Sequence, residues 1–253
     1  MITFLKGLIR QAGNICKKEQ KFLKLSDVSF KNKKDLVTIT DKKVESFIIK
    51  AIRKNYPSHD IFGEETGKTH FSSDYLWIID PIDGTTSFFH QQPFYSISIA
   101  VQHLGQTICG AVYAPNLDEL FYAAKDSGAF LNDQSIDVSR ADRLINCVMG
   151  TGFACLRADL PDNNLPYFNK IVPKLRDIRR YGSAALDLCY VACGRLDGFW
   201  EMNLNIYDIA AGAFIVQKAG GTICDFKGNS NFPEQGIIAA NIYLQKKLLE
   251  NFQ

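Results

Sequence analysis

Apolar residues near the start of the chain recur at helical spacing in two stretches, residues 5–16 and residues 44–52. Because side chains three or four positions apart share one face of a helix, we predict two amphipathic helices there. A polar, lysine-rich loop around Ser26–Asp35 lies between them. Asp41 precedes the second helical pattern, where it is either the N-terminal cap or a residue of a functional site.

Apolar, β-favouring runs follow these helices. Residues Tyr75–Ile79 form a continuous apolar run that stops at Asp80-Pro81, which predicts a buried strand that ends at a functional edge. Three further runs, over residues 95–101, 108–113 and 120–124, are separated by turn signals. They predict an antiparallel meander.

From about residue 140 the chain alternates between helical and strand patterns. We expect a helix over Ala184–Cys193, another after Asp208, and short strands near Ile223 and over Ile237–Ala240. Alternating elements of this kind are typical of mixed α/β folds.

The composition is that of an ordinary folded protein. Of the 253 residues, 46% are hydrophobic and 22% are charged, which is enough apolar material for a sizeable core. No internal repeat or flexible linker is evident in the sequence. We therefore expect a single domain over residues 1–253, built of two αβ halves of about 1–138 and 139–253.

Charge and cysteine content narrow the function classes. The net charge is +2 and the basic residues are scattered, apart from short clusters such as Lys31–Lys34, so a nucleic-acid role is unsupported. Charges near the N-terminus interrupt the apolar residues before a signal peptide or a membrane span could form, so we expect a cytoplasmic protein. The seven cysteines include no CxxC pair and the four histidines are dispersed, which predicts reduced core thiols and no zinc chemistry.

The strongest local signal is the segment Asp80-Pro-Ile-Asp83-Gly-Thr-Thr86, at the end of the predicted buried strand. It offers two carboxylates and then a turn in which Gly84 allows a close backbone approach and the threonine amides can face a phosphate. The alternative is an ordinary Asp-Pro turn followed by a capped helix. Carboxylates beside an anion site favour a function with cations between them.

Other acidic residues stand at the edges of predicted elements. They are Glu64 and Glu65 in Gly63-Glu64-Glu65, Asp41, and Asp208 after Tyr207. Carboxylate oxygens are hard ligands that suit divalent cations in proteins. Together these residues indicate a metal site.

With these motifs the chain resembles the inositol monophosphatase family, within the lithium-sensitive, magnesium-dependent phosphatase superfamily. The resemblance extends through Gly182–Asp187, Gly194–Glu201, Asp208–Gly212 and Ala219–Gly221. It implies an α/β fold built as a layered αβαβα sandwich, with the active site between the two halves. It also implies a cytoplasmic homodimer that hydrolyses phosphate monoesters.

The resemblance implies two or three Mg²⁺ ions per active site. Glu64, Asp80 and the carbonyl of Ile82 would hold the first ion, while Asp80, Asp83 and Asp208 would hold the second. Asp80 would bridge the two ions. A third, weaker ion is expected near Glu64.

The resemblance also assigns catalytic and substrate-binding residues. Thr85, hydrogen-bonded to Asp41, would help Glu64 to orient and deprotonate the attacking water. The implied substrate-binding residues are Gly84 and Thr85 for the phosphate, and Gly182, Ser183, Ala184 and Glu201 for the hydroxyls of a polyol. Without the resemblance, Gly182-Ser183 would be read as a helix cap and Glu201 as a surface acid.

The expected substrate is inositol monophosphate or a related polyol or sugar phosphate. The threonines after Asp83 favour a polyol monophosphate over a 3′(2′),5′-bisphosphate nucleotide, but histidinol phosphate, fructose 1,6-bisphosphate and NADP remain alternatives. The segment Asn203-Leu-Asn-Ile-Tyr207 departs from the family pattern: it keeps an aromatic residue and lacks the usual lysine or histidine, which leaves the polyol selectivity open.

Two further interpretations stay open. Some bacterial relatives also act as partners of the transcription machinery, so a binding role is the alternative of another class. Arg179-Arg180 could attract phosphate or anchor an interface, although we favour solvated surface for this pair.

Overall fold

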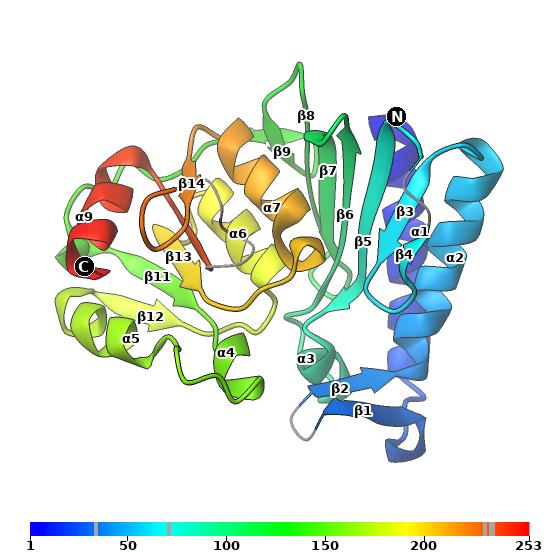
Figure 1. The fold of residues 1–253 in the computed structure, drawn as a ribbon, viewed down its shortest axis with the longest axis horizontal. Coiled ribbons are helices and arrows are strands. Elements are labelled where there is room, and N and C mark those ends of the chain that lie inside the picture. Colours follow the sequence, from blue (N-terminus) through cyan, green and yellow to red (C-terminus); the bar gives the residue numbers. More distant parts are fainter. Residues whose placement is uncertain (33–34, 70–71, 230–231, 233–235, 253) are drawn as a thin grey trace.

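The computed structural model describes residues 1–32, 35–69, 72–229, 232 and 236–252 (Figure 1). The side chains of the Lys31–Lys34 cluster lie outside the described part. Helices and sheets stack in five alternating layers, so the predicted αβαβα sandwich is confirmed. No described helix is long and apolar enough to cross a membrane.

The first layer consists of α1 (Ile2–Gln20) and α2 (Ile39–Asn55), which confirm the two predicted helices. Each presents an apolar stripe, with Leu5 and Ile48 fully buried, to the outer face of the larger sheet (Figure 1). The N-terminal cap of α2 is Thr38, so of the two alternatives for Asp41 the N-terminal cap is wrong. Asp41 instead lies three residues into a capping box, where its carboxylate accepts the Thr38 amide.

The larger sheet has eight strands in the order β10-β9-β8-β7-β6-β5-β3-β4. Their bounds are β3 (Asp60–Gly63), β4 (Gly67–Thr69), β5 (Tyr75–Asp83), β6 (Ser96–His103), β7 (Gln106–Ala114), β8 (Glu119–Ala124), β9 (Ala129–Leu131) and β10 (Gln134–Ile136). Strands β5 to β10 pair with antiparallel neighbours, which confirms the predicted meander. Strand β5 runs four residues beyond the predicted end at Ile79 and includes both carboxylates of the acidic segment.

Helices α6 (Ala184–Ala192) and α7 (Ile206–Lys218) form the middle layer (Figure 1). Every residue of α6 is buried, because the helix is covered on all sides by α7 and both sheets. Helix α7 begins two residues before Asp208, which therefore lies in its first turn. This position directs Asp208 toward the pocket described below.

The smaller sheet has five strands in the order β12-β11-β13-β15-β14. Their bounds are β11 (Val148–Thr151), β12 (Asp177–Arg179), β13 (Gly198–Glu201), β14 (Thr222–Cys224) and β15 (Ile237–Ala240). Helices α5 (Leu165–Ile171) and α9 (Ile242–Phe252) cover its outer face. The remaining elements are η1 (Leu25–Asp27), β1 (Val28–Asn32), β2 (Asp35–Thr38), α3 (Thr85–Phe89), η2 (Leu144–Asn146), α4 (Ala154–Arg157) and η3 (Val172–Lys174).

The cysteines are all free thiols, as predicted. Six of the seven are buried, and only Cys193 is half-buried. They are spread through the layers rather than gathered in one place, with Cys16 in α1, Cys109 in β7, Cys189 in α6 and Cys224 in β14.

Candidate active site

Asp80 and Asp83 reach the same pocket because β5 is irregular. In a regular strand, residues three apart point to opposite faces of the sheet. The pairing of β5 with β6 shifts register between Asp80 and Asp83, and the Ile82 amide donates to an Asp80 oxygen at 3.0 Å. Both carboxylates therefore line one cavity.

Glu64 is placed beside Asp80 by strand pairing. Strand β3 runs parallel to β5, and the Glu64 amide donates to the carbonyl of Ile79 at 3.1 Å. The buried Glu45 of α2 accepts the amides of Glu65 at 3.0 Å and Thr66 at 2.8 Å, which fixes the turn that carries Glu64. Sequence reasoning did not find Glu45, because its helical position indicates an ordinary polar residue.

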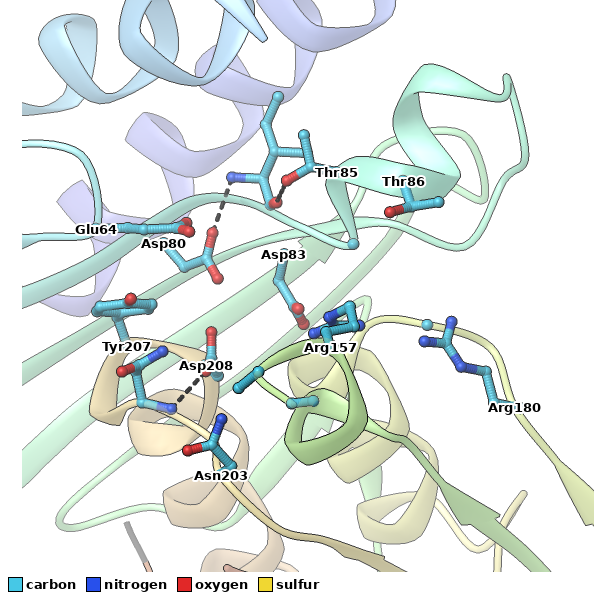
Figure 2. A pocket seen from close by; sticks show the side chains of 16 residues that line it. Glu64, Asp80, Asp83, Thr85, Thr86, Arg157, Arg180, Asn203, Tyr207 and Asp208 are labelled. Atoms are coloured by element: carbon cyan, nitrogen blue, oxygen red, sulfur yellow. Dashed lines mark hydrogen bonds between the residues drawn. The ribbon is translucent and has the colours of Figure 1, made fainter. Parts of the chain in front are cut away.

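Asp208 completes the carboxylate cluster from the opposite side (Figure 2). It closes a capping box at the start of α7, where the Asn205 amide donates to Asp208 Oδ2 at 2.6 Å. Ligand atoms of Asp80, Asp83 and Asp208 all lie within 4.8 Å of one another. This is a distance at which one divalent cation can contact all three.

Thr85 connects the pocket to Asp41. Its hydroxyl lies 3.2 Å from Asp41 Oδ1 and 3.0 Å from the carbonyl oxygen of Ile82. A hydroxyl carries one proton, so it donates to one of these oxygens at a time. The second oxygen of Asp41 accepts the Thr38 hydroxyl at 2.6 Å, which holds the carboxylate in place.

Gly84 is the N-terminal cap of the short helix α3. Its φ of 91° is left-handed, and an added Cβ would lie 3.0 Å from the carbonyl oxygen of Gly182. A side chain would therefore collide with the neighbouring loop. Gly84, Thr85 and Gly182, three of the predicted substrate-binding residues, all line the pocket.

Ser183 lies behind Asp83 and is not part of the pocket wall. Its hydroxyl donates to Asp83 Oδ2 at 2.6 Å and caps α6, and the Ala185 amide donates to the same oxygen at 2.7 Å. Ser183 therefore caps α6, as expected from the sequence alone, and also contacts a carboxylate of the pocket. Ser183 supports a pocket carboxylate directly.

Glu201 lies in a smaller cavity that adjoins the pocket. It is only 5% exposed and accepts the Ala154 amide at 2.8 Å, so the interpretation as a surface acid is wrong. An added Cβ on Gly152 would lie 2.0 Å from its carboxylate, which therefore packs directly on the backbone. Ala184 and Gly182 line the same cavity.

Burial raises the pKa of the carboxyl groups around the pocket. The pKa of Asp41 rises to about 7, that of Asp83 to about 6 and that of Glu201 to about 7, mainly because of burial. Burial, and then the charges of neighbouring carboxylates, raise the pKa of Asp80 and Asp208 well above the usual range.

The carboxylates lie so close together that their mutual repulsion must be offset. Two unit charges 4 Å apart repel by about 4 kcal/mol at the effective dielectric constant typical of such sites. Protons or cations must therefore offset the clustered carboxylates. Because the donors are all oxygens, the set fits Mg²⁺ rather than a metal that prefers nitrogen or sulfur.

Several pocket residues were not predicted as site residues. They are Thr86, Arg157, Arg180, Asn203, Asn205 and Tyr207. Arg179 is half-buried and pairs with Asp177, whereas Arg180 is exposed, as favoured for this pair, and also lines the pocket. Tyr207, the aromatic residue of the departing segment, packs edge-on against Phe62 with ring centroids 5.9 Å apart.

Asp187 is a further buried acid that sequence reasoning missed. It lines the smaller cavity, and its Oδ1 has no hydrogen-bond partner among the described residues. Burial, and then the charges of Glu201 and Asp83, raise its pKa well above the usual range.

The fold and the pocket together define a class of protein. It is an αβαβα sandwich in which β5, α4 and the start of α7 surround a cluster of carboxylates that could hold a cation, beside a glycine-threonine turn. This combination is typical of metal-dependent phosphatases.

Comparison with known proteins narrows the class further. The sequence model of the inositol monophosphatase family matches residues 1–253, and the chain belongs to this family. "Nus factor SuhB" of Pasteurella multocida strain Pm70 is 41% identical over 255 residues, which cover 100% of this chain and 96% of that relative.

Solved structures agree with this assignment. The extragenic suppressor protein suhB from Bartonella henselae superposes with a TM-score of 0.93 at 36% identity, over 100% of this chain and 98% of that one. The Thermotoga maritima IMPase superposes with a TM-score of 0.90 at 35% identity, over 99% and 96% of the two chains.

Proposed function

We propose that this protein is a Mg²⁺-dependent phosphomonoesterase that acts on inositol monophosphate and related polyol or sugar phosphates. The observation that carries the proposal is the convergence of Asp80, Asp83 and Asp208 within 4.8 Å, in a pocket also lined by Glu64. Membership of the inositol monophosphatase family supports the reaction class. The particular substrate is the finer part of the proposal.

The carboxylates would hold the metal ions. Glu64, Asp80 and the carbonyl of Ile82 suit one site, and Asp80, Asp83 and Asp208 suit a second. A third, weaker site is expected near Glu64. When bound, Mg²⁺ ions supply a more acidic water and stabilise the charge on the attacking and leaving oxygens.

The protein's own groups would orient the reactants. The Thr85 hydroxyl, aligned by Asp41, positions the attacking water, and Glu64 accepts its proton. The amides of Gly84 and Thr85 hold the phosphate at the start of α3. Because these groups are fixed before the substrate binds, positioning supplies much of the rate enhancement.

Substrate recognition would take place in the smaller cavity. Glu201 accepts hydrogen bonds from polyol hydroxyls, and the backbone around Gly182 and Ala184 forms the adjoining wall. Ser183 contributes by holding Asp83. Beside Tyr207, this chain lacks the lysine or histidine that relatives carry. The space left there sets the selectivity among polyols.

The proposal is tested by measuring phosphate release from inositol 1-phosphate, with and without Mg²⁺. The panel includes fructose 1,6-bisphosphate, adenosine 3′,5′-bisphosphate, histidinol phosphate and NADP. Asp83→Asn removes a ligand charge at nearly constant size, and we expect it to lower release more than about a hundredfold, since even supporting partners of metal ligands contribute about 10–100-fold.

Asp126→Asn, an exposed acid in the turn between β8 and β9, is the matched control and should keep full activity. Release that does not depend on Mg²⁺, or that survives Asp83→Asn, would contradict the metal-dependent mechanism. A preference for adenosine 3′,5′-bisphosphate would instead identify a nucleotidase.

A second candidate function is association with a transcription complex. Relatives that match this whole chain at 40–42% identity are named Nus factor SuhB. Co-purification of the tagged protein with RNA polymerase from its own host would test this role. An association that persists in Asp83→Asn would show that the binding role does not need catalysis.

We also expect a cytoplasmic homodimer that lithium inhibits, as the family resemblance implies. Sedimentation velocity and LiCl titration of phosphate release would test the last two expectations. Activity in the cytoplasmic fraction would test the first.

A further inference from the structure

Glu45 is a fully buried carboxylate of α2 to which the proposed mechanism gives no role. Its side chain is 0% exposed, and no basic side chain in the described part of the chain pairs with it. A buried charge costs free energy unless hydrogen bonds or an opposite charge compensate it. Among the described residues, the compensation comes from the backbone amides of Glu65 at 3.0 Å and Thr66 at 2.8 Å.

These two amides belong to the turn that joins β3 to β4 and carries Glu64. The Glu65 amide donates to Oε2 of Glu45, and the Thr66 amide donates to Oε1. On the other side of Glu64, its own amide donates to the carbonyl of Ile79 in β5. Because peptide groups are planar, fixing the two that flank one Cα also fixes the direction in which its side chain leaves the backbone. Glu45 and β5 together therefore orient Glu64.

Gly63 leaves the space that the Glu45 carboxylate occupies. A Cβ added at Gly63 would lie 2.5 Å from Cδ of Glu45 and 2.6 and 2.7 Å from its two oxygens. Gly63 is not among the glycines with a positive φ, so its backbone conformation does not require glycine. The requirement is space for the carboxylate.

Helix α2 contacts two turns of the pocket through one face. Asp41 and Glu45 are four residues apart, so their side chains lie one above the other on the helix. Asp41 lies 3.2 Å from the Thr85 hydroxyl, at the turn that follows β5, and Glu45 binds the turn that carries Glu64. The helix therefore sets the position of Glu64 relative to Thr85.

We propose that Glu45 is a positioning residue, which holds Glu64 in the orientation that metal binding and proton acceptance require. The inference rests on the proposed function, because that function assigns both roles to Glu64. Glu64 lines the pocket beside Asp80, whereas Glu45 is not part of its lining (Figure 2). Glu45 therefore acts through Glu64 and touches neither the ion nor the substrate.

Glu45→Ala tests the proposal by calorimetric titration with Mg²⁺ alone, without substrate. Supporting partners of metal ligands contribute about tenfold to a hundredfold in metal affinity or activity, so we expect the Kd of Mg²⁺ to rise by this factor. At saturating Mg²⁺, kcat should fall while the KM for inositol 1-phosphate stays nearly unchanged. Glu45→Gln keeps one acceptor oxygen and turns an NH₂ group toward the other amide, so its Kd should lie between the two.

Asp225→Ala is the matched control for losing a buried carboxylate. Asp225 is also 0% exposed and accepts the amides of Lys227 at 2.8 Å and Asn229 at 2.7 Å, in a turn that does not line the pocket. Its substitution should lower the Tm and leave the Kd of Mg²⁺ unchanged. Equal weakening of Mg²⁺ binding in Asp225→Ala and Glu45→Ala would overturn the proposal, because it would trace the effect to lost stability.

Gly63→Ala gives a second test that does not require removal of the carboxylate. In the wild-type background the added methyl group displaces Glu45 and should weaken Mg²⁺ binding. In the Glu45→Ala background the space is free, so the same change should add little further effect. Strictly additive effects of Gly63→Ala and Glu45→Ala would overturn the proposal.

The outcomes separate this inference from the proposed function. Mg²⁺-dependent release by the wild type, together with unchanged Mg²⁺ binding in a folded Glu45→Ala protein, would overturn this inference alone. A wild-type protein that binds Mg²⁺ but releases no phosphate would overturn the proposed function, and the calorimetric comparison would still decide the role of Glu45. A wild-type protein that does not bind Mg²⁺ would overturn both.

Discussion

At the scale of single residues, hydrogen bonds to one oxygen hold two carboxylates of the pocket in place. Asp83 accepts from Ser183 and Ala185 through Oδ2, and Asp208 accepts from Asn205 through Oδ2. A carboxylate that is fixed in this way needs little reorganisation when an ion binds.

Ser183→Ala tests this arrangement. The change removes the 2.6 Å bond to Asp83 and the hydroxyl cap of α6, so we expect the Mg²⁺ concentration for half-maximal phosphate release to rise about tenfold to a hundredfold. Ser96→Ala is the matched control. It removes the 3.0 Å bond between Ser96 and the Ser183 hydroxyl but keeps the hydroxyl that donates to Asp83. Equal effects of the two substitutions would argue against a role for the Asp83 bond.

The raised pKa values predict how stability depends on pH. Asp41, Asp83 and Glu201 bind protons more tightly in the folded state, where their pKa values are about 7, 6 and 7, than in the unfolded chain, where they are about 4. The folded state therefore binds more protons between about pH 4 and pH 7, and the metal-free protein loses stability as the pH rises through this window.

Thermal unfolding in EDTA and in Mg²⁺ checks this sign. We expect the Tm in EDTA to be lower at pH 8 than at pH 5.5, and Mg²⁺ to raise the Tm more at pH 8, where the carboxylates are ionised. A metal-free protein that is more stable at pH 8 than at pH 5.5 would contradict the burial argument.

At the scale of elements, the site depends on how helices and strands end. The hydrophobic pattern predicted α1, α2, α6 and the meander, because each presents a periodic or continuous apolar face. It did not predict that β5 continues through Asp83, since a register irregularity depends on the neighbouring strand. Capping boxes were also missed, although Thr38 with Asp41 and Asn205 with Asp208 have the required spacing of three residues.

Thr38→Ala tests the capping box that supports Asp41. The substitution removes both the N-terminal cap of α2 and the 2.6 Å bond to Asp41, so we expect a loss of about 1 kcal/mol in the free energy of unfolding and a lower kcat. Denaturant unfolding and steady-state kinetics measure the two effects.

Asn241→Ala provides a comparison for this prediction. Asn241 caps α9 through the Leu244 amide, at a helix away from the pocket. Asn241→Ala should lower the free energy of unfolding without a matching fall in kcat. If Thr38→Ala lowers stability alone, the link from Thr38 through Asp41 to Thr85 does not contribute to turnover.

At the scale of the whole molecule, the two sheets share the middle helices. Helices α6 and α7 belong to the second half of the sequence, yet α7 packs against β6 and β7 of the first half as well as β14 and β15. The pocket is likewise lined by Glu64 to Thr86 and by residues from Ala154 to Asp208. We therefore expect that the two halves do not fold separately.

Expression of residues 1–138 and 139–253 as separate chains tests the prediction of a single domain. We expect neither fragment to show a cooperative unfolding transition by circular dichroism. Residues 1–138 would expose the sheet face that α7 now covers, and residues 139–253 would expose the face of α7 that packs on β6 and β7. The full chain is the control. Independent cooperative folding of either fragment would show that the boundary near residue 138 separates two domains.

The sequence alone identified the central part of the site but not its surroundings. Glu64, Asp80, Asp83 and Asp208 stand beside recognisable turns or element ends, and the structure brings them together. Arg157 and Asp187 lie in segments without such a signal, and only tertiary packing brings them to the cavities. Composition and spacing describe local structure, whereas these contacts join distant parts of the chain.

The buried free thiols can report where the folded protein opens locally. Burial raises the pKa of Cys16, Cys109, Cys189 and Cys224, so these thiols should resist alkylation while the chain stays folded. Each lies in a different structural layer or sheet. The order in which mass spectrometry detects their modification under native conditions would therefore show which layer separates first, without any engineered label.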